Sequence, residues 1–152
     1  MIKTIIKDTY LEMWKGQLIN HSEGKLRTYV KFKSSHGLEN YLSLINNFEL
    51  RRKLTKFRVS SHHLRIESGR YQGILPHLRT CEQCDSGEVE DEIHFLCCNK
   101  FSGDRHELYD IISNVCHNFK NLNNQEKLIW LMVCEDKFVL QTLCKFIRKN
   151  CK

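Results

Sequence analysis

The spacing of cysteine and histidine residues between positions 81 and 98 constrains this chain more than any other sequence feature. Two residues separate Cys81 from Cys84, His94 follows after nine more, and Cys98 lies four positions beyond it. Two thiolates on a tight turn and two further ligands one helical turn apart are the donors of a tetrahedral zinc site. We therefore predict that these four residues bind one structural Zn²⁺ ion, because no open coordination position is evident.

A short helix is expected to carry the second half of this site. Acidic residues at 90–92 suit the first turn of such a helix, where the helix dipole favours negative charge. His94 and Cys98 then share a face. Cys97 is the alternative ligand, because a spacing of three also fits, but it falls on the apolar stripe of Ile93 and Phe101. The alternative for the whole cluster is a set of unrelated buried or disulfide-bonded cysteines.

Length and composition indicate a mainly α protein. The chain has 152 residues, of which 41% are hydrophobic, with one proline and seven glycines. We expect a helical domain with a small CCHC zinc knuckle or hairpin inserted between helices, and Gly87 as the positive-φ residue of its turn. The predicted parts are an N-terminal helix in 1–24, a basic segment and basic helix in 25–78, and the knuckle with C-terminal helices in 79–152. We expect them to form one continuous domain.

The predicted compartment is intracellular and reducing. The sequence has no run of about 18 apolar residues, so a membrane span and a membrane partner are not expected. Its first residues lack the apolar core of a signal peptide. The eight cysteines therefore favour metal binding and buried thiols over a disulfide framework.

Positive charge is concentrated in the middle of the chain. Residues 25–80 contain twelve Lys and Arg against three Asp and Glu, whereas the whole chain has a net charge of only +6. Such a concentration suits a phosphate backbone, although a solvated basic helix face is the alternative. The residues predicted to contact nucleic acid are Lys25, Arg27, Lys31, Lys33, Arg51, Arg52, Lys56, Arg58, His62, Arg65 and Arg70.

Two segments carry these basic residues. Residues 25–33 alternate basic or polar with apolar residues, which predicts an extended segment. Residues 48–68 are predicted to form one helix that ends at Gly69. On that helix Arg51, Arg58, His62 and Arg65 would share one basic face.

Further helices are predicted on both sides of these segments. The stretch 2–20 has apolar residues at helical spacing with Trp14 as a core anchor, and 38–46 reads as a short helix. After the zinc segment, Ser102 restarts a helix. Asn123 and Glu126 resemble a capping box, and 136–150 closes the chain with an amphipathic helix.

The order of motifs resembles the C-terminal region of reverse transcriptases of non-LTR (LINE-type) retrotransposons of animals. The resemblance rests on Lys25-Leu-Arg-Thr-Tyr, Arg52-Lys-Leu-Thr-Lys-Phe-Arg, Gly69-Arg-Tyr, the Cys81 and Cys84 pair, and Glu90-Asp-Glu-Ile-His-Phe-Leu. It covers nearly the whole chain. Family members commonly have one more residue between the histidine and the last cysteine, which keeps Cys97 open as the final ligand.

The resemblance implies a non-catalytic function. In that family this region follows the polymerase and carries a CCHC zinc segment that contributes to nucleic-acid binding during target-primed reverse transcription. The implied partners are RNA or DNA and the remainder of a reverse transcriptase, and we suspect a nuclear location. The paired polymerase carboxylates and an endonuclease site are missing from the sequence, so we expect a fragment or relic of the longer polyprotein. The alternative is a protein-docking module in which zinc only maintains the fold.

Overall fold

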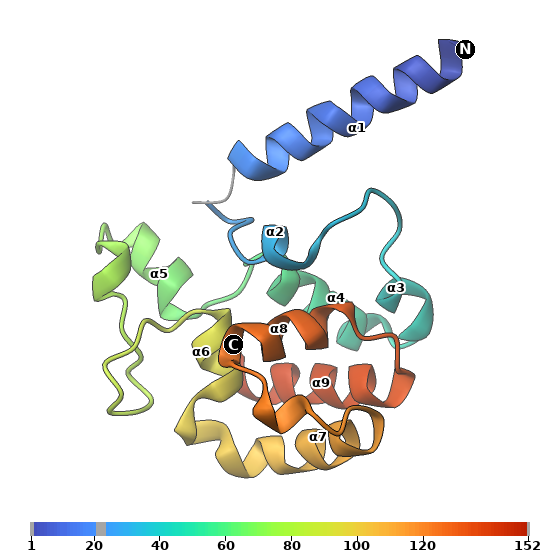
Figure 1. Cartoon of the computed structure of the whole chain (residues 1–152). Helices are drawn as coiled ribbons and strands as arrows, with labels where there is room; N and C mark the ends of the chain where they lie inside the picture. Colours follow the sequence, from blue (N-terminus) through green and yellow to red (C-terminus); the bar gives the residue numbers. More distant parts are fainter. Residues whose placement is uncertain (1, 21–23, 152) are drawn as a thin grey trace.

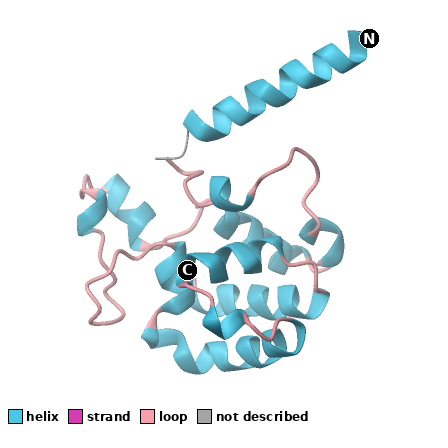
Figure 2. Cartoon of the chain, viewed as in Figure 1, coloured by secondary structure: helices cyan, strands magenta, loops and turns pink. Residues whose placement is uncertain are grey.

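The computed structural model describes residues 2–20 and 24–151, and within them it is mainly helical (Figure 1). The middle of the predicted break between residues 20 and 24 lies outside the described residues. No strand occurs in the described ranges, and Thr80 and Val89 form a single antiparallel bridge (Figure 2). The α-helices are α1 (Ile2–Asn20), α2 (Tyr29–Phe32), α3 (Tyr41–Leu44), α4 (Phe48–Arg58), α5 (Arg65–Tyr71), α6 (Glu92–Cys97), α7 (Ser102–Val115), α8 (Asn124–Val133) and α9 (Lys137–Asn150), and the 3-10 turns are η1 (Pro76–Leu78), η2 (Asn99–Phe101) and η3 (Phe119–Asn121).

The core lies where α9 packs against α4 and α7, and where α6 packs against α8 (Figure 1). Phe57 of α4, Phe95 of α6 and Phe146 of α9 are buried there, and the rings of Phe95 and Phe146 are 5.3 Å apart between centroids. Burial of several aromatic side chains supplies a large part of the hydrophobic stabilisation of such a core. This core fixes the position of α6, which carries the candidate site.

Local caps define the start of both C-terminal helices, and the one at α8 was predicted from sequence. Asn123 and Glu126 form the reciprocal capping box at the start of α8. The side chain of Asp136 accepts hydrogen bonds from Phe138 N and Val139 N at the start of α9, both at 2.9 Å. The apolar stripe of the predicted amphipathic helix is buried in α9, where Val139, Leu143 and Ile147 are at most 1% exposed. Here the cap and the apolar stripe are both local, so sequence and structure agree.

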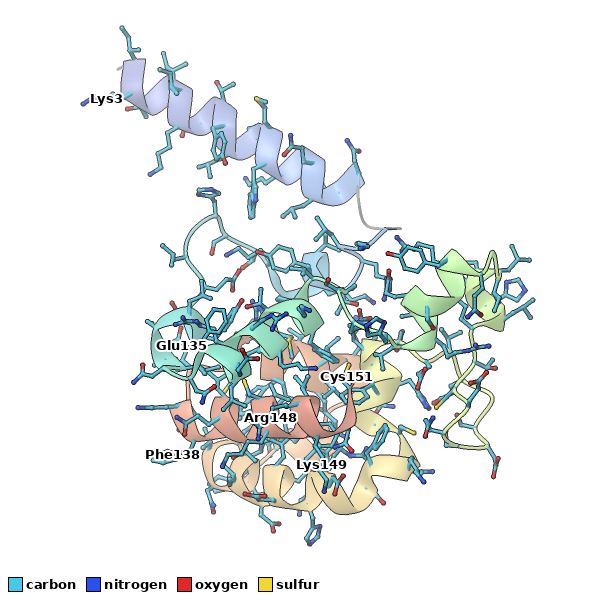
Figure 3. All side chains as sticks on the ribbon, turned by 180° about the vertical axis from the view of Figure 1, so that it is seen from behind. Lys3, Glu135, Phe138, Arg148, Lys149 and Cys151 are labelled. Carbon is cyan, nitrogen blue, oxygen red and sulfur yellow. The ribbon has the colours of Figure 1, made fainter. Side chains whose placement is uncertain are left out.

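The helix predicted at 2–20 is present as α1, but its predicted burial is wrong. Leu18 is the buried residue of α1, whereas Ile2 is 75% exposed and Ile6 is 64% exposed. Trp14 is half-buried and meets the edge of the His36 ring at 5.4 Å between centroids, outside the core. Figure 3 shows most side chains of α1 extending into open space and not onto the helical body. An apolar stripe predicts a helix, but it does not say which surface covers it.

The extended segment predicted at 25–33 is instead a turn followed by the single helical turn of α2. Tyr29 and Phe32 are three residues apart and pack edge to face at 5.4 Å between ring centroids. Short alternating runs suit a strand or a helix of one turn equally well. Tertiary contacts of the buried residues Thr28 and Phe32 decide between them here.

The single helix predicted at 48–68 is also wrong, because the chain breaks after Arg58 and resumes at Arg65. Ser60 has a φ of 52°, a left-handed conformation that a helix cannot continue through. Its hydroxyl donates a 2.5 Å hydrogen bond to Glu92, a residue of α6. A distant carboxylate therefore stabilises the break, which the local pattern of apolar residues cannot reveal.

Gly69 lies inside α5 and does not end the predicted helix. A Cβ atom at this position would lie 2.8 Å from Cγ of Arg79. The Arg79 side chain is buried and donates to the carbonyl oxygens of Ile66 and Ile74 at 2.6 and 2.8 Å. Glycine is therefore needed for the close approach of Arg79 to α5. The predicted helix at 38–46 is shorter than expected, since α3 spans one turn and Leu38 is 88% exposed.

Candidate metal centre

The structure brings together the four side chains predicted as ligands. The Sγ atoms of Cys81, Cys84 and Cys98 and a ring nitrogen of His94 all lie within 4.8 Å of one another. The Cys81 and Cys98 sulfurs are 4.0 Å apart, and the Cys84 sulfur is 3.4 Å from Nε2 of His94. Tetrahedral zinc with bonds of about 2.3 Å to sulfur and 2.0 Å to nitrogen implies edges of about 3.8 and 3.5 Å. The group can therefore hold a metal ion.

A tight turn positions the first two cysteines. Cys81 N donates to the carbonyl oxygen of Glu88 at 2.8 Å, which pairs the two sides of the turn beside the bridge at residues 80 and 89. Gln83 N donates to Cys81 Sγ at 3.3 Å. Gly87 has a φ of 70°, as predicted. Backbone bonds of this kind place both sulfurs on one side of the turn before any metal binds.

Helix α6 positions the other two ligands. The Asp91 side chain caps its start by accepting a 2.8 Å hydrogen bond from His94 N. Cys98 follows the last residue of the helix with extended backbone angles. The buried Arg105 donates to the carbonyl oxygens of Cys98 and Cys97 at 2.5 and 3.2 Å. It satisfies two C-terminal carbonyl groups of α6 and so fixes the segment that carries Cys98.

Cys97 lies outside the four-residue group. Its side chain is half-buried and packs against the hydrophobic core. Burial raises the pKa of its thiol, with a smaller opposing effect from the nearby Arg105 charge. The structure thus brings Cys98 to the site and assigns Cys97 to packing.

Glu88 orients the imidazole of His94. Its Oε2 atom is 2.7 Å from Nδ1 of His94, while Nε2 faces the Cys84 sulfur. A carboxylate on the outer nitrogen of a metal-binding histidine fixes the tautomer and ring orientation and raises the basicity of the ligating nitrogen. Neither Glu88 nor Arg105 was identified from sequence. Glu88 is one of several acidic residues near the CxxC turn, and Arg105 contacts only backbone atoms of the segment that carries Cys98.

The thiols of the site differ in their acidity. Burial raises the pKa of Cys81 to about 12 and also raises that of Cys98. Hydrogen bonding with Ser86, whose Oγ is 3.2 Å from the sulfur, lowers the pKa of Cys84 to about 6. Two of the three thiols therefore keep their protons at neutral pH unless a cation is bound. A divalent metal ion would stabilise the thiolate form of all three.

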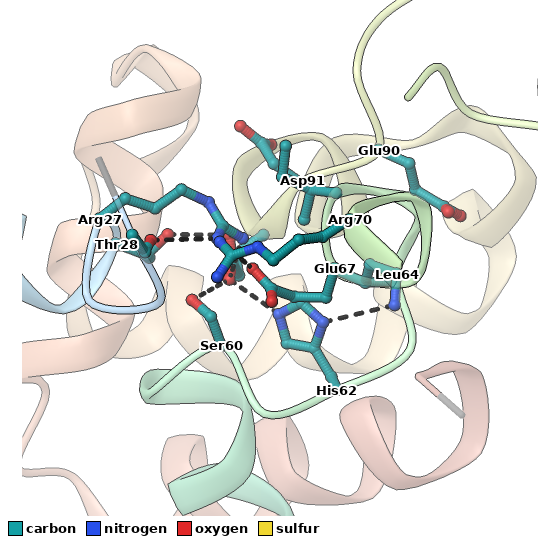
Figure 4. A network of polar contacts seen from close by, with 12 residues as sticks. Arg27, Thr28, Ser60, His62, Leu64, Glu67, Arg70, Glu90 and Asp91 are labelled. Atoms are coloured by element: carbon teal, nitrogen blue, oxygen red, sulfur yellow. Dashed lines mark hydrogen bonds and ion pairs between the residues drawn. The ribbon is translucent and has the colours of Figure 1, made fainter. Parts of the chain in front are cut away.

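Three residues predicted to contact phosphates belong instead to a buried network around Glu92 (Figure 4). Arg27 donates to both oxygens of Glu92 at 2.9 and 3.1 Å, and His62 Nε2 lies 2.7 Å from Oε1. Thr28 donates at 2.8 Å and Ser60 at 2.5 Å. Burial alone would raise the pKa of Glu92, but the hydrogen bond from His62 and the charge of Arg27 hold it at about 2. The other acid, Glu67, pairs with Arg27 and Arg70.

Arg58 also serves the interior of the molecule. It is 2% exposed, donates to the backbone carbonyl of Met132 and pairs with Glu39 at 2.5 Å. Its guanidinium lies 4.5 Å from the ring centroid of Phe32 and 4.7 Å from that of Tyr41. These contacts engage both terminal nitrogens and the face of the guanidinium, whereas its Nε is buried without a hydrogen-bond partner among the described residues. Arg58 and His62 therefore cannot share an exposed basic face with Arg51 and Arg65, and that prediction is wrong.

The remaining predicted contacts are divided between paired and exposed side chains. Arg51 donates to the carbonyl oxygen of Leu42 at 3.1 Å, Arg65 pairs with Glu82 at 3.0 Å, and Lys33 pairs with Glu39 at 2.7 Å. The exposed side chains are those of Lys25, Lys31, Arg52 and Lys56, of which Arg52 lies 3.7 Å from Glu49 and Lys31 donates to Gln125 at 3.1 Å.

None of the helices in the described ranges is long and apolar enough to cross a membrane. Comparison of the chain with family models, curated proteins and solved structures found no match. The candidate metal centre and the surface of this chain are therefore the features from which function can be inferred.

Proposed function

We propose that Cys81, Cys84, His94 and Cys98 bind one structural zinc ion and form a CCHC knuckle. The observation that carries this proposal is the convergence of three sulfurs and one imidazole nitrogen within 4.8 Å. Three thiolates with one imidazole suit zinc better than hard cations, which prefer oxygen ligands. Four protein ligands complete a tetrahedral shell, so the ion would stabilise the fold and leave no position for substrate.

We further propose that the chain is a non-catalytic nucleic-acid-binding module, corresponding to the C-terminal region of a non-LTR retrotransposon reverse transcriptase or to a relic of it. Its role would be to hold RNA or DNA phosphates during target-primed reverse transcription. The net charge of +6 supports this proposal, together with the exposed lysines Lys25, Lys31 and Lys56. A non-catalytic role is consistent with the way Glu67 and Glu92 are engaged in internal ion pairs.

A protein-docking module is the second candidate, and α1 is the observation that favours it. Ile5, Ile6, Tyr10 and Met13 are each more than half exposed on a helix that extends from the body (Figure 3). Exposed apolar residues grouped on one element are typical of protein interaction sites. The remainder of a reverse transcriptase would be the partner.

Metal content tests the zinc assignment. We expect protein purified under reducing conditions to contain one zinc ion per chain and Cys98→Ser to lose it, because a tetrahedral site needs its fourth ligand. Cys97→Ser is the matched control and should retain the ion. Loss of zinc on Cys97→Ser alone would move the fourth ligand by one residue, and absence of zinc from the parent protein would refute the assignment.

Salt-dependent binding of RNA and DNA oligonucleotides tests the nucleic-acid proposal. If six phosphates of a duplex are neutralised, the logarithm of the affinity should fall with the logarithm of salt concentration with a slope of about −5. Absence of binding at low salt would contradict the proposal. A salt-insensitive complex with a protein partner that depends on the apolar residues of α1 would favour the docking module.

A further inference from the structure

We propose that Lys25, Lys53, Lys56, His63 and Tyr71 line a surface track that binds single-stranded nucleic acid. We call this set the lysine track. The inference rests on the proposed nucleic-acid-binding function and specifies both the surface and the form of the ligand. It replaces the basic face predicted along residues 51–65, which the break after Arg58 disrupts.

Two adjoining hollows form the track. The first, of about 480 Å³, is lined by Lys25, Lys56, His63 and Tyr71, and the second, of about 140 Å³, is lined by Lys53 together with Lys56 and His63. Because the side chains of Lys56 and His63 line both hollows, the two hollows adjoin each other, and we treat them as one depression. A flexible strand can follow such a depression, whereas a rigid duplex meets only its rim.

The cations of the track are available to a ligand. No ion pair or hydrogen bond joins the ammonium groups of Lys25, Lys53 or Lys56 to another described residue, in contrast to the paired side chains of Arg27 and Arg58. Among the residues that the structure describes, no carboxylate lines the second hollow. Glu67 lines the first, but its charge is offset by the ion pairs with Arg27 and Arg70. The track therefore presents net positive charge to phosphate groups.

Tyr71 gives the track a surface for bases. It ends α5 and is 77% exposed, although an aromatic side chain of this size is usually at least partly buried. Stacking of a base on such a ring is tolerant of sequence and needs an unpaired base with a free face. Lysines beside an exposed ring are the combination that single-strand-binding surfaces use, which is why we assign a single strand and not a duplex.

The buried Glu92 network holds the wall of the track. Ser60 adopts its left-handed conformation with its hydroxyl bonded to Glu92, and Ser61 N donates to Lys56 O at 2.7 Å. These bonds turn Ser61 and His63 outward into the wall shared by both hollows, while His62 between them points into the buried network. Strained backbone of this kind persists only where surrounding structure enforces it and is concentrated at binding sites. Ser61 and Ser68 add hydroxyl groups to the lining of the first hollow.

Substitution of two lysines tests whether the lysine track binds phosphate groups. The double variant Lys53→Gln/Lys56→Gln should bind a fluorescent single-stranded oligonucleotide about 25-fold more weakly at 0.1 M salt, with a salt slope reduced by about 1.4, because two phosphate contacts are lost. The matched control is Lys100→Gln/Lys120→Gln, which removes the same charge from two exposed lysines that do not line these hollows. The control should weaken binding less than about twofold.

Substitution of Tyr71, combined with an abasic oligonucleotide, tests whether bases stack on this ring. Tyr71→Ala should weaken binding between about fivefold and a hundredfold, whereas Tyr71→Phe should bind nearly as the parent does, because the ring is kept. With an abasic oligonucleotide of equal length, Tyr71→Ala and the parent should bind equally. A structural role for Tyr71 would weaken binding of both oligonucleotides alike.

The outcomes separate this inference from the proposed function. Parent protein that binds single-stranded RNA or DNA, with loss in the track variants and not in the control, supports both. Equal losses in the track and control variants, or tighter binding of duplex than of single strand, would overturn the lysine track and leave the proposed function in place. No binding by the parent at low salt would overturn both. Zinc content and melting temperature should match the parent in every variant.

Discussion

Helix α6 separates two buried polar clusters that differ in how their charge is satisfied. Glu92, at its start, is surrounded by the chain's own donors, with Arg27 and His62 among them. His94, two residues later, faces three thiols, two of which have pKa values raised by burial. The carboxylate of Glu92 is therefore satisfied within the chain without any ligand, although Arg27 Nε and Glu67 Oε2 are buried without a hydrogen-bond partner among the described residues. In the second cluster burial favours the protonated, neutral form of these thiols, and a bound cation would stabilise their thiolate form.

Metal removal should have the largest effect. Chelation under reducing conditions should lower the free energy of unfolding by about 10 kcal/mol or more, as for small zinc domains, because the thiol cluster has no internal counter-charge. Urea melts with and without a strong chelator measure the change. Identical midpoints would show that the thiol cluster, like the Glu92 network, needs no bound ion in the folded state. They would contradict the proposed difference between the two clusters.

Glu92→Gln should have the next largest effect. The amide keeps the shape but leaves the Arg27 guanidinium without its buried partner, and breaking a buried ion pair costs about 3 to 5 kcal/mol. Chemical denaturation of the zinc-loaded protein provides the measurement. Glu107→Gln is the control, because Glu107 is exposed and makes no ion pair with a described residue. A loss as small as that of the control would show that the network contributes little.

Acid should disrupt the two clusters at different pH values. The pKa of Glu92 is lowered from 4.5 to about 2, so its contribution is complete above pH 4.5 and is lost as pH falls through 2. The shift corresponds to about 3 kcal/mol. Protons compete with the metal for imidazole and thiolate already at about pH 5 to 6. Zinc release should therefore precede the final loss of helical circular dichroism, and a single coincident transition would contradict the separation.

Glu88→Gln should have the smallest effect of the four. It removes the carboxylate from Nδ1 of His94 and should weaken zinc affinity about 10- to 100-fold without removing a ligand. Competition with a chromophoric chelator gives the affinity. The exposed Glu82→Gln is a nearby control that also lines the turn region but does not contact His94. Equal affinities of the two variants would exclude an orienting role for Glu88.

The C-terminal helices could be predicted from sequence because their determinants are local. The cap at Asp136 and the apolar stripe of α9 lie within fifteen residues of one another and agree. The middle of the chain could not be predicted, because its basic residues are positioned by distant acids. Arg27 pairs with a glutamate 65 residues away, and Ser60 is held by the same side chain. A positive charge in a sequence does not reveal whether its partner is a ligand or the protein itself.

The candidate metal centre was predictable for a similar reason. The four ligand residues lie within eighteen positions, so their spacing alone reports a possible site. The residues that orient them gave no such signal. Arg105 contacts only backbone carbonyl groups of the site, and the partner of His94 is one of several glutamates in the turn.

The close approach of Arg79 to Gly69 has a consequence for engineering this protein. Replacing a helical glycine by alanine ordinarily stabilises a protein by about 1 kcal/mol. Here the added methyl group would meet Arg79 Cγ at 2.8 Å, and Arg79 is held in place at two carbonyl oxygens. Gly69→Ala should therefore destabilise the protein, against the general rule. Gly16 has open space around it, and Gly16→Ala should stabilise the protein as the rule predicts.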